Sequence, residues 1–402
     1  MDHDAFRELL TPHGQKALAD AVRMVEDGAD AVAAAVGLRR THPADLAGAA
    51  LTQARLRARG AAKFGADAAV MYFTPDGLEQ ATRAEVADHR ARRFEPGARV
   101  ADVCCGIGGD LLALARAGCV VDAVDRDPLT VEVARANADA LGLSGRVTVT
   151  VGDAAGVTPE RYDALFADPA RRVTGRRVFD PLSYSPPWPD VLALAGRARG
   201  ACLKVAPGVP YELLPAGAEA EWVSYRGEVK EAAVWTGALG PADGASDGLP
   251  ADGGVLRRAT MLPSGLSMTP DPGLGEPAVG PVARYLYEPD GAAIRAHLVA
   301  EVAAAVGGHL LDPRIAYITG DGPEVTPWAS RYEVRETMPF SGKRLRAALR
   351  EREIGAVTLK KRGSALDLER LRRDLRLSGG NSCVVVLTRI GENPYALICE
   401  PA

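Results

Sequence analysis

The stretch Arg99-Val-Ala-Asp-Val-Cys-Cys-Gly-Ile-Gly-Gly-Asp110 decides the fold of this 402-residue chain. It predicts a short buried strand that ends in a turn, followed by a helix whose first turn Asp110 can cap. Glycines at 106, 108 and 109 permit a tight turn and let a ligand approach the backbone closely. A strand, a glycine loop and a helix in this order open a doubly wound α/β domain, which binds ligands outside the carboxyl ends of its strands.

Further strands follow, and each delivers an acidic residue at or near its end. We expect these strands at 120–124, 147–151 and 164–167. With the first strand, the four acids in the series are Asp102, Asp125, Asp153 and Asp168. A single acid here is typical of a turn or a helix cap, but four in series indicate one acidic crevice. Such a crevice repels phosphates and suits a sulfonium, an ammonium, a ribose and an adenine. We therefore predict S-adenosylmethionine as the cofactor.

The spacing of these residues resembles that of a known family. Asp125 follows Gly106 by 19 residues, the separation at which an acid can accept from both ribose hydroxyls. Leu111 stands where a dinucleotide fingerprint has its third glycine. Together with Gly152-Asp-Ala154 and Asp168-Pro-Ala-Arg171, the series resembles the motifs of class I S-adenosylmethionine-dependent methyltransferases. The tail resembles the THUMP-like domain of a bacterial subfamily of these enzymes.

The resemblance implies an α/β fold with a Rossmann-like, seven-stranded class I methyltransferase core. A helical N-terminal region and a small α+β C-terminal domain accompany the core. The expected divisions are a helical region at 1–70, the methyltransferase domain at 71–240, a linker with a possible strand at 241–280, and the THUMP-like domain at 281–402. A fifth strand at 201–205 and a closing hairpin, 219–225 with 229–236, complete the core.

The tail pattern predicts a βαβαββ-like arrangement after a helix at 294–306. The expected elements are strand 332–336, helix 342–351, strand 356–361, helix 368–375, and strands 383–388 and 395–399. At the other end of the chain, apolar residues at helical spacing predict helices over 4–64. The region ends with the basic residues Arg55, Arg57, Arg59 and Lys63. They form either a solvated helix face that also compensates the helix dipole, or an edge that faces RNA. A turn is predicted at 75–77.

The resemblance also assigns the residues that bind the cofactor. The residues expected to bind the cofactor from the glycine loop and the strand ends are Asp102, Cys104, Gly106, Gly108, Asp125, Arg126, Asp153 and Ala154. Among them, Asp125 is expected to hold the ribose and Asp153 the adenine amino group. Gln80 and Thr82 are expected to border the methionine end, with a plain helix cap as the alternative. Cys104 and its neighbour are expected to be small packing residues, not nucleophiles.

The candidate catalytic residues are Asp168, Pro169 and Arg171. In relatives with Asp-Pro-Pro-Tyr motifs, the acid and a backbone carbonyl accept from the target amine and aim its lone pair at the methyl group. Here Ala170 and Arg171 replace the proline and the aromatic residue, which leaves amine chemistry open. Arg171 and nearby arginines could instead clamp a phosphate backbone or form a solvated basic loop. Pyrimidine C5 chemistry needs a thiolate, and the chain has no Pro-Cys motif for it.

Two stretches are candidates for substrate binding. Ser185-Pro-Pro-Trp188 resembles the motif of cap-guanine N2-methyltransferases, so Tyr184 or Trp188 could stack on a base; alternatively, the prolines only begin the next helix. Residues 343–376 hold twelve Lys/Arg against five acids, and this +7 segment leaves −11 for the rest of the chain. Such asymmetry indicates a polyanion partner. The basic charge of this segment is most concentrated at Lys360, Lys361 and Arg362. The alternative interpretation of the segment is a charged helix face.

Composition bounds the remaining possibilities. The six cysteines form no C-x-x-C pair, so we expect no metal site. The first residues lack a signal-peptide pattern, and no apolar run approaches the ~20 residues of a membrane helix, so we expect a cytoplasmic protein. The function predicted is in-line methyl transfer to an RNA base of tRNA or rRNA. The alternatives are a small-molecule or protein methyltransferase with a structural tail, and an inactive RNA-binding module. Protein partners stay unknown.

Overall fold

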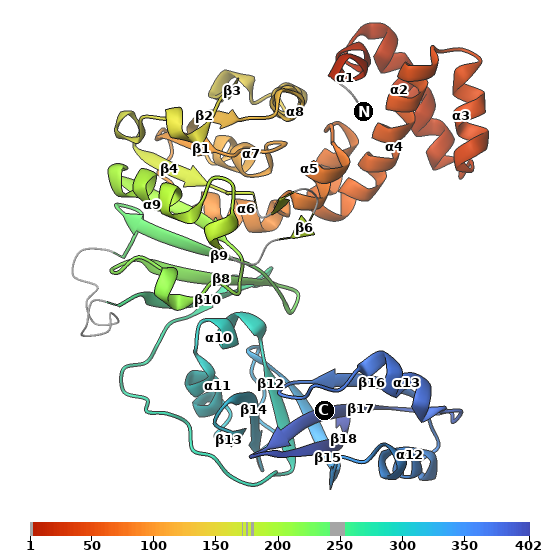
Figure 1. The fold of residues 1–402 in the computed structure, drawn as a ribbon, viewed down its shortest axis with the longest axis vertical. Coiled ribbons are helices and arrows are strands. Elements are labelled where there is room, and N and C mark those ends of the chain that lie inside the picture. Colours follow the sequence, from red (N-terminus) through yellow and green to blue (C-terminus); the bar gives the residue numbers. More distant parts are fainter. Residues whose placement is uncertain (1–2, 171, 174–175, 178–180, 242–253) are drawn as a thin grey trace. The chain divides into compact units, whose positions relative to one another are not determined.

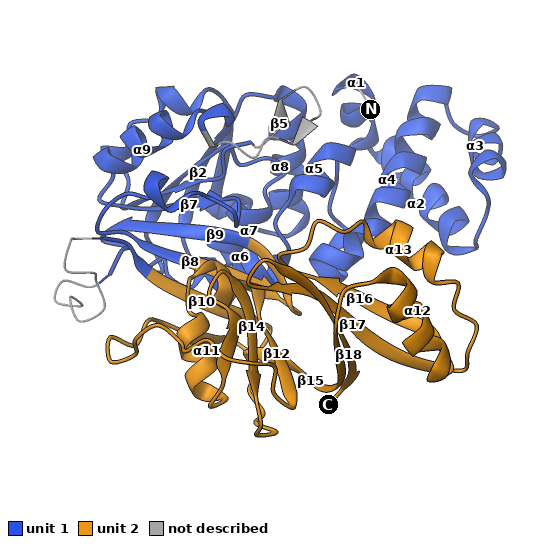
Figure 2. Ribbon diagram, turned by 60° about the horizontal axis from the view of Figure 1, so that its bottom comes forward, with its two compact units in different colours: residues 1–220, 231–245, 249–256 blue, residues 221–230, 246–248, 257–402 orange. Residues whose placement is uncertain are grey.

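The structure is a computed structural model that describes residues 3–170, 172–173, 176–177, 181–241 and 254–402. It forms two compact units (Figure 2). Unit 1 comprises Met1–Ala220, Glu231–Ala245 and Leu249–Leu256, and unit 2 comprises Glu221–Lys230, Ser246–Gly248 and Arg257–Ala402. The boundary therefore passes through a strand hairpin, and the domain divisions inferred from the sequence stay a prediction.

Helices form the first part of unit 1, as predicted (Figure 1). They are α1 (His3–Leu9), α2 (Pro12–Glu26), α3 (Ala31–Arg39) and α4 (Ala44–Phe64), then the 3₁₀ turn η1 (Gly65–Ala69), α5 (Pro75–Gln80) and α6 (Ala84–Ala91). The turn predicted at 75–77 is wrong, because Pro75 begins α5. The Thr74 side chain caps this helix by accepting from the Gly77 amide at 2.9 Å, and proline is tolerated in a first turn.

A nine-stranded sheet carries the core, in the order β11-β10-β8-β9-β7-β4-β1-β2-β3. Its strands are β1 (Arg99–Val103), β2 (Val120–Asp125), β3 (Val147–Val151), β4 (Ala164–Ala167), β7 (Gly200–Val205), β8 (Glu219–Tyr225), β9 (Glu228–Gly237), β10 (Leu256–Leu262) and β11 (Leu266–Met268). All seven strands of the predicted core are present. The possible strand expected within the 241–280 linker is β10, and β11 pairs with it antiparallel. The observed sheet is thus two strands wider than predicted.

The parallel part of this sheet places the acidic strand ends at one edge. β1 pairs in parallel with both β2 and β4, β2 with β3, and β4 with β7, while β9 runs antiparallel to β7. The connecting elements are α7 (Gly109–Arg116), α8 (Pro128–Ala140), α9 (Trp188–Arg197), the short ribbon β5 (Arg172–Val173) and β6 (Arg176–Arg177), and the 3₁₀ turns η2 (Ser144–Arg146), η3 (Ala154–Gly156), η4 (Pro159–Arg161), η5 (Pro181–Ser183) and η6 (Tyr211–Leu213). Because parallel strands share their carboxyl edge, the loops that follow them converge there.

Unit 2 contains a seven-stranded sheet in the order β13-β14-β12-β15-β18-β17-β16. Its elements are β12 (Tyr285–Pro289), α10 (Gly291–Arg295), α11 (Val299–Ala305), β13 (His309–Asp312), β14 (Ile315–Gly320), β15 (Ala329–Pro339), α12 (Gly342–Glu351), β16 (Ile354–Lys361), α13 (Leu368–Leu375), β17 (Asn381–Ile390) and β18 (Asn393–Pro401). Helices α12 and α13 have the predicted bounds. The single helix expected at 294–306 is two helices, separated where His297 adopts a φ of +54°.

Two apolar clusters stabilise unit 2. One contains Leu345 of α12, Leu371 of α13 and Val385 of β17, and the other contains Tyr317 and Val386. Val385 and Val386 are neighbours on one strand, and successive strand side chains point to opposite faces, so the sheet has an apolar cluster on each face. Across the described part of the chain, no helix combines the length and the hydropathy that a membrane span requires.

Candidate cofactor and catalytic site

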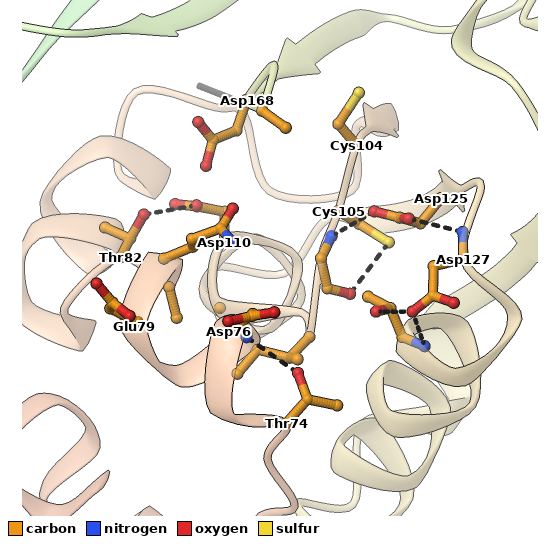
Figure 3. A pocket seen from close by; sticks show the side chains of 18 of the residues that line it. Thr74, Asp76, Glu79, Thr82, Cys104, Cys105, Asp110, Asp125, Asp127 and Asp168 are labelled. Atoms are coloured by element: carbon orange, nitrogen blue, oxygen red, sulfur yellow. Dashed lines mark hydrogen bonds between the residues drawn. The ribbon is translucent and has the colours of Figure 1, made fainter. Parts of the chain in front are cut away.

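A cavity of about 710 Å³ lies at the carboxyl edge of the parallel strands in unit 1 (Figure 3). Its lining comes from residues 74–82 without Leu78, from the loop after β1, and from the ends of β2 and β4. Six lining residues are acidic: Asp76, Glu79, Asp110, Asp125, Asp127 and Asp168. No lysine or arginine is among the described lining residues, so the cavity favours cationic ligands over phosphates.

A smaller cavity of about 80 Å³ shares Cys104, Asp125 and Ala170 with the large one. Its other lining residues are Val124, Arg126, Gly152, Asp153, Ala154, Ser185 and Pro186. Ala170 and Ser185 hold this side together, since the amide of each donates to the carbonyl of the other at 2.9 and 3.0 Å. Arg126 also donates to the Ser185 hydroxyl. The two cavities together give an elongated site that begins beside α5 and ends beside β3.

The loop after β1 is shaped by backbone that favours glycine. Cys104, Gly106 and Gly108 have φ values of +67°, +55° and +93°. A Cβ built on Gly106 would meet no atom within 4 Å, so it would enter the open cavity. The Gly106 amide donates to Asp125 Oδ2 at 3.0 Å, and the Asp127 amide donates to Asp125 Oδ1 at 3.1 Å. Asp125 therefore fixes the loop while its carboxylate still lines both cavities.

Cys104 contributes a thiol to both cavity walls. Burial raises the pKa of this thiol well above its usual range, and the nearby Asp125, Asp168 and Asp102 carboxylates raise it further. Thiolate is the nucleophilic form of cysteine, so Cys104 is a protonated wall residue in this site. This agrees with its expected packing role.

A buried ionic network lies beneath the large cavity. Arg90 is paired with both Asp110 and Glu231, and all three side chains are less than a tenth exposed. The Thr82 hydroxyl donates to Asp110 Oδ2 at 2.8 Å. Burial opposes the charge of Arg90, but the two carboxylates outweigh it and raise the pKa of Arg90. Burial likewise opposes ionisation of Asp110, but Arg90, Lys204 and Thr82 outweigh it and lower the Asp110 pKa.

Lys204 of β7 connects this network to the candidate catalytic acid. Its Nζ donates to Thr82 Oγ1 and to Asp168 Oδ2, each at 2.6 Å, and lies 3.9 Å from Asp110 Oδ2. Burial opposes the charge of Lys204, yet Asp168 and Asp110 raise its pKa, so the side chain remains an ammonium. Lys204 thus holds one oxygen of Asp168. No described residue donates to the other oxygen, Oδ1, and Asp168 lines the cavity.

Asp102 is fully buried at the centre of β1. Both of its carboxyl oxygens lack a hydrogen-bond partner among the described residues. Burial raises the pKa of Asp102 well above its usual range, and the carboxylates of Asp110, Asp168 and Asp125 raise it further against the effect of Arg90. Buried acceptors without donors are expensive, so this environment favours the protonated, neutral form of Asp102.

The structure brings most of the predicted site residues together. Gln80, Thr82, Cys104, Gly106, Asp125, Asp168 and Pro169 line the large cavity, and Arg126, Asp153 and Ala154 line the small one. Asp102 lies below the loop, and Gly108 is the N-cap of α7 and is not among the lining residues of either cavity. Arg171 lies outside the described residues. Arg90, Lys204 and Glu231 were missed, although Lys204 was visible as a lone lysine within the apolar strand Ala-Cys-Leu-Lys-Val.

The expectation that Tyr184 or Trp188 is available for base stacking is wrong. Tyr184 and Trp188 are only 3% and 1% exposed, and Trp188 Nε1 donates to the Leu213 carbonyl at 2.8 Å. Trp188 is the first residue of α9, so the prolines before it begin a helix, which was the alternative considered. The two residues of the motif that reach the site are Ser185 and Pro186.

The three basic tail residues expected to bind substrate are engaged within unit 2. Lys360 Nζ donates to Glu288 Oε2 at 2.5 Å, and Lys361 Nζ donates to the Leu366 carbonyl at 2.8 Å. The guanidinium of Arg362 lies 5.6 Å from the Tyr317 ring centroid. Each of these contacts stabilises the tail fold and leaves less of the cation available to a ligand.

The residues present fit S-adenosylmethionine. Its sulfonium and ammonium match the six carboxylates of the lining. The open space in front of Gly106 and the elongated pair of cavities accommodate a ligand of that size. Within the described ranges, no group of three His, Cys, Asp or Glu side chains is placed to hold a metal ion.

Three family models match parts of the chain. A methyltransferase domain matches residues 100–173, a THUMP domain-like model matches residues 329–401, and a domain of unknown function matches residues 2–60. The solved structure of a putative methyltransferase from Porphyromonas gingivalis is similar to that of this chain, and 22% of the aligned residues are identical between the two. The TM-score is 0.73, and the likeness covers 90% of this chain and 92% of that one. This likeness confirms the fold.

Relatives among known proteins extend the comparison. An RNA methyltransferase of Parasynechococcus marenigrum, itself uncharacterized, is 34% identical over 28% of this chain and 26% of its own length. An uncharacterized S-adenosylmethionine-dependent methyltransferase of Mycobacterium tuberculosis is 37% identical over 363 residues, which are 86% of this chain and 95% of that protein. With this identity over most of both proteins, this chain belongs to the family of S-adenosylmethionine-dependent methyltransferases.

Proposed function

We propose that this enzyme methylates a base in structured RNA. The observation that carries the RNA part is a cavity of about 500 Å³ between α12 and α13 in unit 2. Its wall carries the cations Lys343, Arg346 and Arg370 against the two acids Asp367 and Asp374, and its apolar lining comes from Phe340, Leu366, Leu371 and Leu375. Cations beside an apolar floor suit a nucleotide, which has a phosphate and a base. This cavity lies within the THUMP domain-like match.

Two further findings support RNA as the substrate. The relative from Parasynechococcus marenigrum is named as an RNA methyltransferase. A 23S rRNA uracil C5-methyltransferase of Chromobacterium violaceum is 35% identical over 91 residues, or 20% of this chain. The chemistry of that second relative is not carried over, because the cavity thiol here, Cys104, has a raised pKa.

We assign the parts of the cofactor to particular residues of the acidic site. We place the ribose hydroxyls at Asp125, next to Arg126, and the adenine amino group at Asp153 and Ala154 beside the small cavity. The methionine end then lies near Gln80, Thr82, Cys104 and Gly106, above Asp102 and close to Gly108. Hydroxyl and amino donors match these carboxylate acceptors. Bound there, S-adenosylmethionine supplies a methyl group on a sulfonium.

Asp168 is the proposed acceptor for the substrate, with Pro169 beside it. Lys204 holds Asp168 Oδ2, so Oδ1 is the oxygen that can accept a hydrogen from a target N–H. Accepting that hydrogen fixes the nitrogen lone pair in one direction, and alignment of this kind is a large part of the catalysis of a displacement reaction. Arg171 follows in the sequence and is a candidate contact to an RNA phosphate.

Replacing Asp168 tests this role. Asp168→Ala is expected to lose methyl transfer while it retains S-adenosylhomocysteine binding, measured by calorimetry. Transfer is followed with tritiated S-adenosylmethionine and RNA from a strain that lacks the gene, and the labelled nucleoside is identified by mass spectrometry. Wild-type turnover by Asp168→Ala would remove this residue from the mechanism. Label in no RNA fraction would contradict the RNA substrate.

A small-molecule or protein substrate is the second candidate. The engaged state of Lys360, Lys361 and Arg362 favours it, because these cations support the tail fold. Filter binding to total tRNA at two salt concentrations separates the candidates. RNA binding through phosphates must weaken as salt rises, whereas a flat response would favour the second candidate.

A further inference from the structure

One wall of the cofactor cavity has little regular structure of its own. We name residues 70–82 the wall segment. It contains one short helix, α5, and its residues 71–74 belong to no helix or strand. Nearly all of its second half lines the large cavity, including Gln80 and Thr82. A segment this short cannot fix its own position, because isolated short helices are unstable in water. Other parts of unit 1 must hold it.

Helix α4 holds the start of the wall segment by contacts to its backbone. The Gln53 side chain is fully buried; its Nε2 donates to the Phe73 carbonyl at 2.5 Å, and the Phe73 amide donates to its Oε1 at 3.0 Å. Arg57 donates from Nε to the Met71 carbonyl at 2.8 Å and from Nη2 to the Val70 carbonyl at 3.1 Å. These side chains replace the pairing that a neighbouring strand would provide.

Lys63, at the end of α4, holds the other half. Its Nζ donates to the carbonyls of Leu78, Glu79 and Ala81 at 2.8, 2.8 and 2.7 Å. These carbonyls lie at the C-terminal end of α5, where a helix leaves its last carbonyls without internal partners. A cation there also compensates the helix dipole. Of the roles expected for this basic stretch, a solvated face with dipole compensation or an RNA-facing edge, only dipole compensation describes Lys63, and the helix end it contacts is that of α5.

The opposite side of the wall segment is fixed to the glycine loop. Asn137 of α8 is fully buried; its Oδ1 accepts from the Tyr72 amide at 2.6 Å, and its Nδ2 donates to the Tyr72 and Ile107 carbonyls at 3.0 and 2.9 Å. A Cβ on Gly77 would come within 2.3 Å of Ile107 Cγ2, so α5 packs directly on the loop. Movement of the wall segment would consequently disturb both the loop and Thr82.

We propose that α4 is a working part of the cofactor site, with Lys63 as a positioning residue. None of its residues is among the described lining of the cavity, so its action is through the wall segment. This gives the N-terminal helical region, most of which matches a domain of unknown function, the task of setting the shape of the cavity around the methionine end.

Lys63→Met tests this role, because methionine keeps an apolar stem and removes three hydrogen bonds. The matched control is Arg55→Met, since Arg55 lies on the same helix and is exposed. Calorimetry with S-adenosylhomocysteine is expected to show affinity roughly tenfold weaker for Lys63→Met and unchanged for Arg55→Met. Amide hydrogen exchange of residues 77–82 is expected to accelerate in Lys63→Met alone. Lys63→Arg, which keeps a cation, is expected to recover much of the affinity.

Wild-type affinity together with wild-type exchange in Lys63→Met would overturn the proposal. An equal loss in Arg55→Met would do so as well, because it would show a general effect of changing α4. If Lys63→Met does not fold, Arg57→Met takes its place with the same two measurements, and wild-type values there would also overturn it.

Discussion

The two charged regions of this enzyme use the same residue types in opposite ways. Below the cofactor cavity, the side chains of Arg90 and Lys204 are 4% and 5% exposed and each contacts specific carboxylates. On α13 of unit 2, the side chains of Arg370 and Arg372 are 77% and 53% exposed. Their acidic partners, Asp374 and Glu369, are exposed as well. Buried charges determine geometry, because each must keep its partner. Exposed charges instead create an electrostatic field, which dissolved salt weakens by screening.

This contrast explains why one region is a site of defined shape and the other is a surface. The buried network holds Thr82, Asp110 and Asp168 at fixed positions around the cavity. The arginines at the cavity between α12 and α13 make contacts that are open to water, Arg346 with the Asp374 carbonyl and Arg370 with the Asp374 carboxylate, and a ligand can replace such contacts. Variants in the two regions should therefore differ in what they change, and the following experiments test that difference.

The largest effect is expected from breaking the buried network at its cation. Arg90→Met leaves the buried Asp110 and Glu231 carboxylates without their partner, so the free energy of unfolding should fall by about 3 to 5 kcal/mol. Arg372→Met, in an exposed pair, should change it by less than about 0.5 kcal/mol. Urea unfolding followed by circular dichroism measures both. Similar losses in the two variants would erase the contrast.

The next effect concerns ligand binding. Asp125→Ala removes the proposed ribose acceptor and the acceptor of the Gly106 and Asp127 amides, so affinity for S-adenosylhomocysteine should fall roughly a hundredfold. Asp122→Ala is the matched control on the same strand, because Asp122 pairs with Arg99 away from the cavity. Calorimetry gives the dissociation constants. A wild-type constant for Asp125→Ala would show that this acid does not hold the cofactor.

A smaller effect on stability is expected from replacing Asp102, and it should be an increase, unlike the loss expected for Arg90→Met. Its pKa is raised in the folded protein, so above the unfolded pKa of about 3.9 the folded state binds a proton that the unfolded state releases. Stability from this group therefore falls as pH rises through that window. Asp102→Asn cannot ionise, so it should be more stable than the wild type by about 1 kcal/mol or more at pH 8. Thermal unfolding at pH 5 and pH 8 measures this.

The difference between Asp102→Asn and the wild type should grow with pH. A constant difference between pH 5 and pH 8 would mean that Asp102 ionises in the fold at its usual pKa. A separate measurement tests ligand binding. If the buried carboxyl serves the cationic end of the cofactor, Asp102→Asn should bind S-adenosylmethionine more weakly than the wild type does.

The smallest effect on stability is expected in the tail. Lys343→Gln together with Arg370→Gln should leave the free energy of unfolding within about 0.5 kcal/mol of wild type. The two changes should lower the log–log salt slope of RNA affinity by about 0.7 for each lost phosphate contact. Filter binding at several salt concentrations provides the slope. An unchanged slope would place the RNA contact elsewhere or remove it.

Local signals explain what could be predicted from the sequence. The start of α13 follows from Asp367, whose side chain accepts from the Glu369 and Arg370 amides at the N-cap. The acids of β1, β2, β3 and β4 were recognisable because each lies at or near the end of a short apolar strand, and parallel pairing brings such ends together.

The missed features depend on contacts between distant residues. Lys204 contacts Thr82 across 122 positions and Asp168 across 36, and nothing local to any of the three encodes these bonds. Trp188 looked available because its motif resembles a stacking motif, yet it is only 1% exposed. Helix α5 was mistaken for a turn because Pro and Gly favour turns, whereas Lys63, far away in the sequence, stabilises the helix end.

Cys104 lines both cavities, in the space where we propose that the methyl donor binds. Sulfur in its anionic form would compete with the substrate for the methyl group and inactivate the enzyme by alkylating itself. Burial and the surrounding carboxylates keep that sulfur protonated, since they raise its pKa. The same negative charge that attracts the donor thus also protects the catalyst from it.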